Sequence, residues 1–167
     1  ASGKTKFKTV ADAQREQMIV GAAGPGSDTH DFALILNTML GTKMKLISGF
    51  QAQAAIFLAI ERGELDGNSG ASVGTLMALK PSYLTAPGEL NFLLQLATEP
   101  HPTYLKGVPL VMDYAKNDID RKALELAFVR QKIAYAFNAP VQTTQGALNT
   151  LGALNIGSAN TVTTVGN

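Results

Sequence analysis

The sequence contains no cysteine and no tryptophan, and it has only two histidines among its 167 residues. Without cysteine the chain forms no disulfide and offers no thiolate nucleophile, so its composition suits an oxidising or a reducing compartment. With two histidines and no thiolate, a transition-metal site would lack ligands. We therefore expect the protein to use neither a metal nor another cofactor.

An excess of charge of one sign is missing as well. The chain has 14 basic and 13 acidic residues, so its formal net charge is +1. This balance gives no extended positive field to hold a polyanion, and we expect no nucleic-acid partner. The basic cluster of Lys4, Lys6 and Lys8 around Phe7 is interpreted as a solvated terminus. No apolar run approaches the length of about 20 residues that crosses a bilayer.

The chain does have the length and composition of one globular domain. Hydrophobic residues make up 46% of it and charged residues 16%, and a chain of this length buries roughly 70% of its unfolded surface on folding. No charged residue follows Lys132. We predict one α/β lobe over residues 1–140 and an uncharged, weakly ordered tail over residues 141–167.

Apolar strands and amphipathic helices alternate along the chain. Strands are predicted at Met18–Ala23, Lys43–Phe50, Leu65–Ser69 and Leu90–Ala97, and a last one is considered at Ala134–Pro140. Helices are predicted at Phe32–Leu40, Ala52–Gly63 and Ser72–Lys80, within Val108–Ala115, and at Ile119–Gln131. This order predicts a mostly parallel sheet with helices on both faces, a three-layer α/β fold.

A glycine-rich turn, "GAAGPGSDTHDF", separates the first strand from the first helix. Gly24 and Gly26 allow positive φ and a close approach of the backbone to a ligand. The N–H groups of Ser27, Asp28 and Thr29 would point outward from the first helical turn. Together with the helix dipole, such groups favour an anion, most simply a carboxylate.

Other interpretations of this turn remain open. Ser27, Asp28 or Thr29 could simply cap the helix, and the acidic side chains of Asp28 and Asp31 would repel an incoming anion. The turn lacks the lysine of a Walker loop and the G-x-G-x-x-G spacing, which argues against nucleotide binding. Ser27 and His30 need not face each other, and G-x-S-x-G is absent. We therefore expect no catalytic residues.

Five segments of the sequence, in register, resemble one protein family. They are "GAAGPGSDTHDF", "LNTMLGTKMKLISGF", "LAIERGELDG", "LLQLATEPHP" and "VPLVMDYAKNDIDRKALEL". Together they are similar to the solute receptors of the tripartite tricarboxylate transporters, which are type 2 periplasmic binding proteins. The resemblance covers about residues 8–140.

This resemblance implies a larger protein than the present chain. The family has two α/β lobes joined by a hinge, binds a small carboxylate ligand in the cleft and delivers it from the periplasm to membrane transporter subunits. The segment "FKTVADAQREQMIVGAAG" resembles the entry into the second lobe. We therefore expect the chain to correspond to the second lobe only, as a fragment whose first lobe lies upstream or as a stand-alone descendant.

The resemblance also implies a ligand site made of three loops. Gly24–Thr29 would offer backbone N–H groups to a carboxylate, Gly49–Gln51 would form the neighbouring wall, and Ser69–Ser72 would form the third loop. The implied ligand-binding residues are Gly24, Gly26, Ser27, Asp28, Thr29, Gly49, Phe50, Gln51, Ser69 and Ser72.

Two further functions remain as alternatives. A bare cleft face could pair with a second copy, which would make a free-standing homodimer with a structural or regulatory role. A small-molecule enzyme is the third hypothesis. The solute itself is not specified by the sequence, because its contacts would come from both lobes.

Overall fold

The computed structural model describes residues 1–137, and the side chains of residues 1–128. Residues Ala1–Val129 form one compact unit, and the end of the last helix belongs to a second unit, Arg130–Asn167. The tail predicted over residues 141–167 lies outside the described residues.

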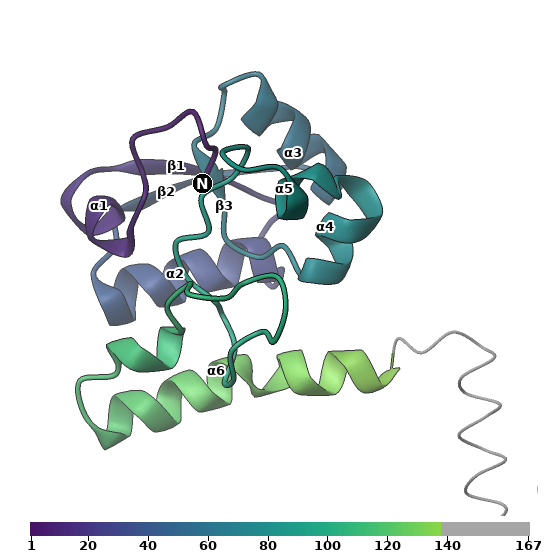
Figure 1. Ribbon diagram of the computed structural model, residues 1–167. Helices are drawn as coiled ribbons and strands as arrows, with labels where there is room; N and C mark the ends of the chain where they lie inside the picture. Colours follow the sequence, from purple (N-terminus) through teal and green to yellow (C-terminus); the bar gives the residue numbers. More distant parts are fainter. Residues whose placement is uncertain (138–167) are drawn as a thin grey trace, which may run out of the picture. The chain divides into compact units, whose positions relative to one another are not determined.

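The first unit is built on a three-stranded parallel sheet with the strand order β2-β1-β3 (Figure 1). Its strands are β1 (Met18–Ala22), β2 (Met44–Ser48) and β3 (Gly67–Asn68). Val20 in the central strand pairs with Leu46 on one side and with Gly67 on the other. All three strands therefore end at the same edge of the sheet.

Helices follow each strand and precede the first one. They are α1 (Val10–Arg15), α2 (Asp28–Leu40), α3 (Gln53–Glu61), α4 (Val73–Leu79), α5 (Ser82–Thr85), the 3₁₀ helix η1 (Val111–Tyr114) and α6 (Asp118–Phe137). Local sequence explains several of the ends. Thr9 and Asp12 form a capping box at the start of α1, and Gly41 adopts the left-handed conformation that ends α2.

The two faces of the sheet are covered by different helices (Figure 1). Met18 and Val20 of β1 are buried in a core cluster with Ala33 of α2. Gly21 faces the other way, because a Cβ added to it would lie 2.9 Å from Ile56 Cγ2 of α3. The predicted α/β fold, with a parallel sheet between helices on both faces, is therefore confirmed.

Aromatic pairs anchor the helices in two of the hydrophobic clusters. The rings of Phe32 in α2 and Phe128 in α6 lie 5.0 Å apart, and both side chains are almost fully buried. The rings of Phe57 in α3 and Tyr83 in α5 lie 5.4 Å apart. Each buried phenylalanine contributes about 1.5–3 kcal/mol through removal of its apolar surface from water.

The strand predicted at Leu90–Ala97 is wrong. These residues make only isolated bridges, from Leu90 to Ser2 and from Gln95 to Leu110. Their apolar side chains pack against different parts of the core, since Leu90 contacts the cluster around α3 whereas Leu94 contacts the cluster around α2 and α6. The apolar run therefore reflects burial on several sides and not a place in the sheet.

Other element predictions need smaller corrections. The helix expected within Val108–Ala115 is a short 3₁₀ helix, η1, and the prediction missed α1 and α5. The strand considered at Ala134–Pro140 is wrong as far as Phe137, because α6 continues to that residue; the rest lies outside the described residues. A helix satisfies its backbone hydrogen bonds within one segment, whereas a strand at these residues would need a neighbouring strand as its partner.

The N-terminal segment is more than a solvated terminus. Phe7 is 1% exposed and belongs to the core cluster of β1 and α2, while Lys6 forms an exposed ion pair with Glu16. The lysines therefore lie around a buried aromatic side chain, Phe7, which packs in the core. Within residues 1–137, no helix combines the length and the apolar character that a membrane crossing requires.

Candidate ligand-binding site

Three loops meet at the edge of the sheet where the strands end. The first loop is Ala23–Ser27, between β1 and α2, the second is Gly49–Ala52, between β2 and α3, and the third is Ser69–Ser72, between β3 and α4. Ligands of open α/β sheets collect at this edge, because strand ends and helix starts converge there. The loops that the resemblance implied are thus the ones that the topology brings together.

The first loop is a tight turn held by its own side chains. The Ser27 hydroxyl donates to the Gly24 carbonyl at 2.6 Å and accepts from the Gly24 N–H at 3.3 Å. The Thr29 hydroxyl, at the start of α2, accepts from the Ala23 N–H at 3.0 Å. Gly26 has a φ of 85°, and a Cβ placed on Gly24 or Gly26 would meet nothing within 4 Å. The outer side of this turn is therefore open.

Acidic side chains border the first loop. The Gly26 N–H donates to Asp31 Oδ1 at 3.0 Å, and His30 Nδ1 lies 3.0 Å from the same oxygen. Asp28 is exposed as the first residue of α2. The N–H groups of Gly24, Gly26 and Ser27 all have acceptors within the protein. Some of the backbone N–H groups that were expected to bind a carboxylate are thus already occupied by hydrogen bonds within the protein.

Of the residues considered as caps for α2, Ser27 does not cap the helix with its side chain. Ser27 occupies the N-cap position, but its side chain makes no capping hydrogen bond and bonds to Gly24 instead. The 13-residue helix α2 therefore begins at the loop cluster, and the Ser27 side chain does not cap the positive end of its dipole.

The second loop is tied to the end of the central strand. The Gly49 N–H donates to the Ala23 carbonyl at 3.0 Å, and the Phe50 N–H donates to the Ala22 carbonyl at 3.3 Å. Gly49 has a φ of 108°, a conformation that favours glycine. Phe50 is half-buried against the α3 cluster, while Gln51 is exposed. The second loop therefore stands beside the first, as the resemblance implied.

The third loop packs directly on the start of α2. The buried Ser69 hydroxyl donates to the Thr29 carbonyl at 2.9 Å. A Cβ added to Gly70 would lie 2.8 Å from the Thr29 backbone nitrogen, so only glycine fits there. Ser72 caps α4 by accepting from the Thr75 N–H at 3.1 Å. This loop therefore supports the first loop more than it faces solvent.

Two residues that the sequence analysis did not select also lie at this edge. Asn68 is the last residue of β3, and Gln53 is the first residue of α3. Buried amide atoms of both side chains have no hydrogen-bond partner among the described residues. Their positions at a strand end and a helix start could have drawn attention to them, but their lack of partners is visible only in the structure.

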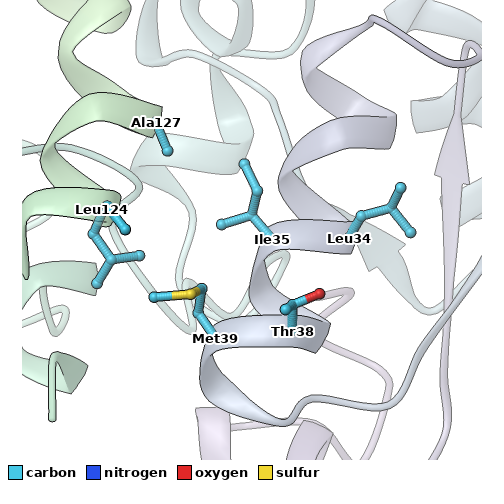
Figure 2. Close-up of a pocket in the computed structure, with 7 residues that line it drawn as sticks. Leu34, Ile35, Thr38, Met39, Leu124 and Ala127 are labelled. Carbon is cyan, nitrogen blue, oxygen red and sulfur yellow. The ribbon is translucent and has the colours of Figure 1, made fainter. Parts of the chain in front are cut away.

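A separate hollow lies between α2 and α6 (Figure 2). It measures about 280 Å³ and is lined by Leu34, Ile35, Thr38, Met39, Ala123, Leu124 and Ala127. Thr38 supplies the only polar side chain among these residues, and none of them is charged. The hollow offers nothing to neutralise a carboxylate, so the loop edge is the better candidate for the ligand site.

No protein-family model matches the sequence, and no curated protein matches it. The fold, however, resembles that of a solved protein. In particular, the structure is similar to the crystal structure of a TctC solute binding protein from Polaromonas, solved with no ligand.

The similarity covers part of each chain. The TM-score is 0.54 at 18% sequence identity, and the match covers 76% of this chain and 48% of the Polaromonas chain. The present chain thus spans about half the length of this structural neighbour. The resemblance to tripartite tricarboxylate receptors is confirmed for the fold, and the matched protein is described as a solute binding protein.

Proposed function

We propose that this chain is a solute-binding domain whose ligand binds at the three loops, and that it has no catalytic role. The observation that carries the proposal is the convergence of these loops at the carboxyl edge of a parallel sheet, in a fold shared with a TctC solute binding protein. A hydrogen bond from Gly49 to Ala23 joins the second loop to the first, and one from Ser69 to Thr29 joins the third loop to the start of α2.

A small carboxylate is the ligand class that we propose. The N-terminal end of α2 points its positive dipole at the loop cluster, which favours a negative group there. The open side of Gly24 and Gly26 leaves room for that group. By extension from the matched class of protein, we propose that the domain works in the periplasm and serves membrane transporter subunits.

We further propose that a second body completes the site, either a first lobe or a second copy of this chain. Binding proteins of this kind enclose the ligand between two lobes, whereas one lobe leaves half of its polar groups in water. Each charge-assisted hydrogen bond that is missing weakens binding by about 1.5–3 kcal/mol. This chain alone should therefore bind carboxylates with dissociation constants of roughly millimolar order.

Calorimetric titration of the chain with citrate, succinate, glutamate and aromatic acids tests these proposals, with light scattering run in parallel. Weak binding that strengthens as the protein concentration rises would support completion by a second copy. Micromolar binding by a strict monomer would show that the single lobe is already a complete site. Failure of every acid to bind would contradict the carboxylate proposal.

A further inference from the structure

Two side-chain amides near the loop edge are buried without partners. The atoms are Nδ2 and Oδ1 of Asn68 and Nε2 of Gln53, and none has a hydrogen-bond partner among the described residues. An amide buried in this state costs stability, because it has lost its bonds to water and gained none in the protein. Their presence therefore calls for a role other than stabilising the fold.

The topology places both amides on the same face of the sheet. Asn68 pairs with Gly21 in the parallel register, so the side chains of these two positions point to one face. That face is covered by α3, since Ile56 lies against Gly21. Gln53 precedes Ile56 by one helical turn, toward the edge where the strands end. Both amides thus lie beside the second and third loops.

The surroundings of the amides are apolar but close to the surface. Phe50 of the second loop and Ala71 of the third are partly buried against the same cluster as Ile56. Asn68 and Gln53 are each half-buried as whole residues, although these amide atoms are buried. An amide in such surroundings discriminates between ligands, because only a ligand that donates and accepts hydrogen bonds there offsets the cost of its burial.

The charges at the loops disfavour a ligand with several carboxylates. The residues from Ala23 to Asp31, from Gly49 to Gln53 and from Asn68 to Ser72 include no lysine or arginine. They do include Asp28 and Asp31. Nothing at this edge would neutralise a second or third negative group, whereas an uncharged group that donates and accepts would match the amides.

We propose that Asn68 and Gln53 contribute to the specificity of the loop site by binding a carboxamide of the solute, so that this lobe favours a monocarboxylate bearing an amide over a di- or tricarboxylate. This inference rests on the proposed function. Asn68 donates from Nδ2 to the carboxamide oxygen and accepts at Oδ1 from its NH₂ group. Gln53 Nε2 donates a further hydrogen bond to the same oxygen.

The test is an NMR titration of the full chain with succinamate, succinate and butyrate, which share a four-carbon skeleton. Succinamate carries one carboxylate and one amide, succinate carries two carboxylates, and butyrate has a methyl group in place of the amide. We expect the side-chain NH₂ signals of Asn68 and Gln53 to shift with succinamate alone. We also expect succinamate to bind about tenfold more tightly than either analogue.

Two matched variants separate ligand binding from folding. Asn68→Leu removes an unpartnered amide, so it should raise the unfolding temperature and reduce succinamate affinity to that of butyrate. Asn37→Leu is the control, because Asn37 donates to the Met44 carbonyl and accepts from the Met44 N–H, both at 2.9 Å. This control should lower the unfolding temperature.

Three results would overturn the inference. Loss of stability in Asn68→Leu comparable to that in Asn37→Leu would show that the Asn68 amide is partnered inside the protein. Binding of succinate and butyrate with no advantage for succinamate would refute the inference while leaving the proposed function intact. Failure of all three probes to bind would refute the inference and the proposed function together.

Discussion

The first and third loops lie on either side of the start of α2, yet they are built in opposite ways. Gly24 and Gly26 face open space, and their turn is held by hydrogen bonds among its own residues. Gly70 instead lies against the Thr29 backbone with no room for a Cβ. Glycine therefore leaves the first loop open to a ligand and allows close backbone packing in the third loop.

This difference separates the residues that could meet a solute from those that hold them in place. Ser69 and Gly70 hold the first turn of α2 in place through one hydrogen bond and one close backbone contact. Gly26 is exposed at the tip of the first loop. Substitutions in the third loop should therefore act on stability, and substitutions at the first loop's tip should act more on binding.

The largest effect is expected for Gly70→Ala. The new Cβ would lie 2.8 Å from the Thr29 nitrogen and 2.9 Å from the Asp28 carbonyl carbon, and backbone atoms cannot move aside cheaply. We expect a loss of about 2–3 kcal/mol in the free energy of unfolding, measured by urea denaturation. Gly24→Ala is the control and should stay within about 0.5 kcal/mol. Equal losses in both variants would remove the contrast between the loops.

The next effect is expected for Gly26→Val. A β-branched residue resists the φ of 85° at this position, and we expect a cost of about 1–2 kcal/mol in unfolding free energy. The valine side chain would also occupy the open side of the turn. Titration with succinamate should show a larger loss of affinity than for Ser27→Ala, and the reverse ranking would count against backbone approach at this loop.

A smaller effect is expected for Ser27→Ala. The substitution removes the hydroxyl that bonds to the Gly24 carbonyl and accepts from the Gly24 N–H. Because the loop is partly solvated, water can replace these bonds, and we expect a loss of about 1 kcal/mol by urea denaturation. A loss as large as that of Gly70→Ala would show that the first loop is also a packing element.

The smallest effect is expected far from both loops, for Glu61→Gln. Hydrogen bonds from Lys80 and from the Tyr83 hydroxyl lower the pKa of Glu61 below its ordinary value of 4.5. A lowered folded-state pKa contributes stability above pH 4.5 that is lost as the pH falls through the folded pKa. Both members of the ion pair are partly exposed, so the contribution is smaller than that of Ser27.

Acid titration of stability checks this last prediction. Below about pH 4.5, wild-type stability should fall slightly more steeply than that of Glu61→Gln, in matched urea denaturation series. Identical pH profiles for the two proteins would show that the ion pair contributes nothing measurable.

The sequence predicted the elements whose periodicity reflects a single buried face. β1, α2, β2, α3 and α4 were expected close to their observed bounds, because each combines the apolar pattern of a regular helix or strand with burial against the core. Leu90–Ala97 was mistaken for a strand because its side chains are buried on several sides without strand pairing. The capping box of Thr9 and Asp12 was a usable signal for α1.

The candidate site was predictable in position but not in detail. Strand-loop-helix order indicated where Gly24 and Gly49 would meet, since parallel strands end at one edge. The N–H groups of Gly24 and Gly26 are occupied by hydrogen bonds to the side chains of Ser27 and Asp31. These bonds depend on side-chain conformations that no sequence pattern specifies. The unpartnered amide of Asn68 likewise depends on its neighbours in space.

The most direct test of the account is backbone amide chemical-shift mapping of the chain with succinamate at rising millimolar concentration. If the three loops form one ligand site, the shifted signals should cluster at Gly24–Thr29, Gly49–Gln51 and Ser69–Ser72. Signals from the apolar hollow between α2 and α6 should stay unchanged. Shifts confined to that hollow, or no saturable shift at the loops, would contradict the central claim.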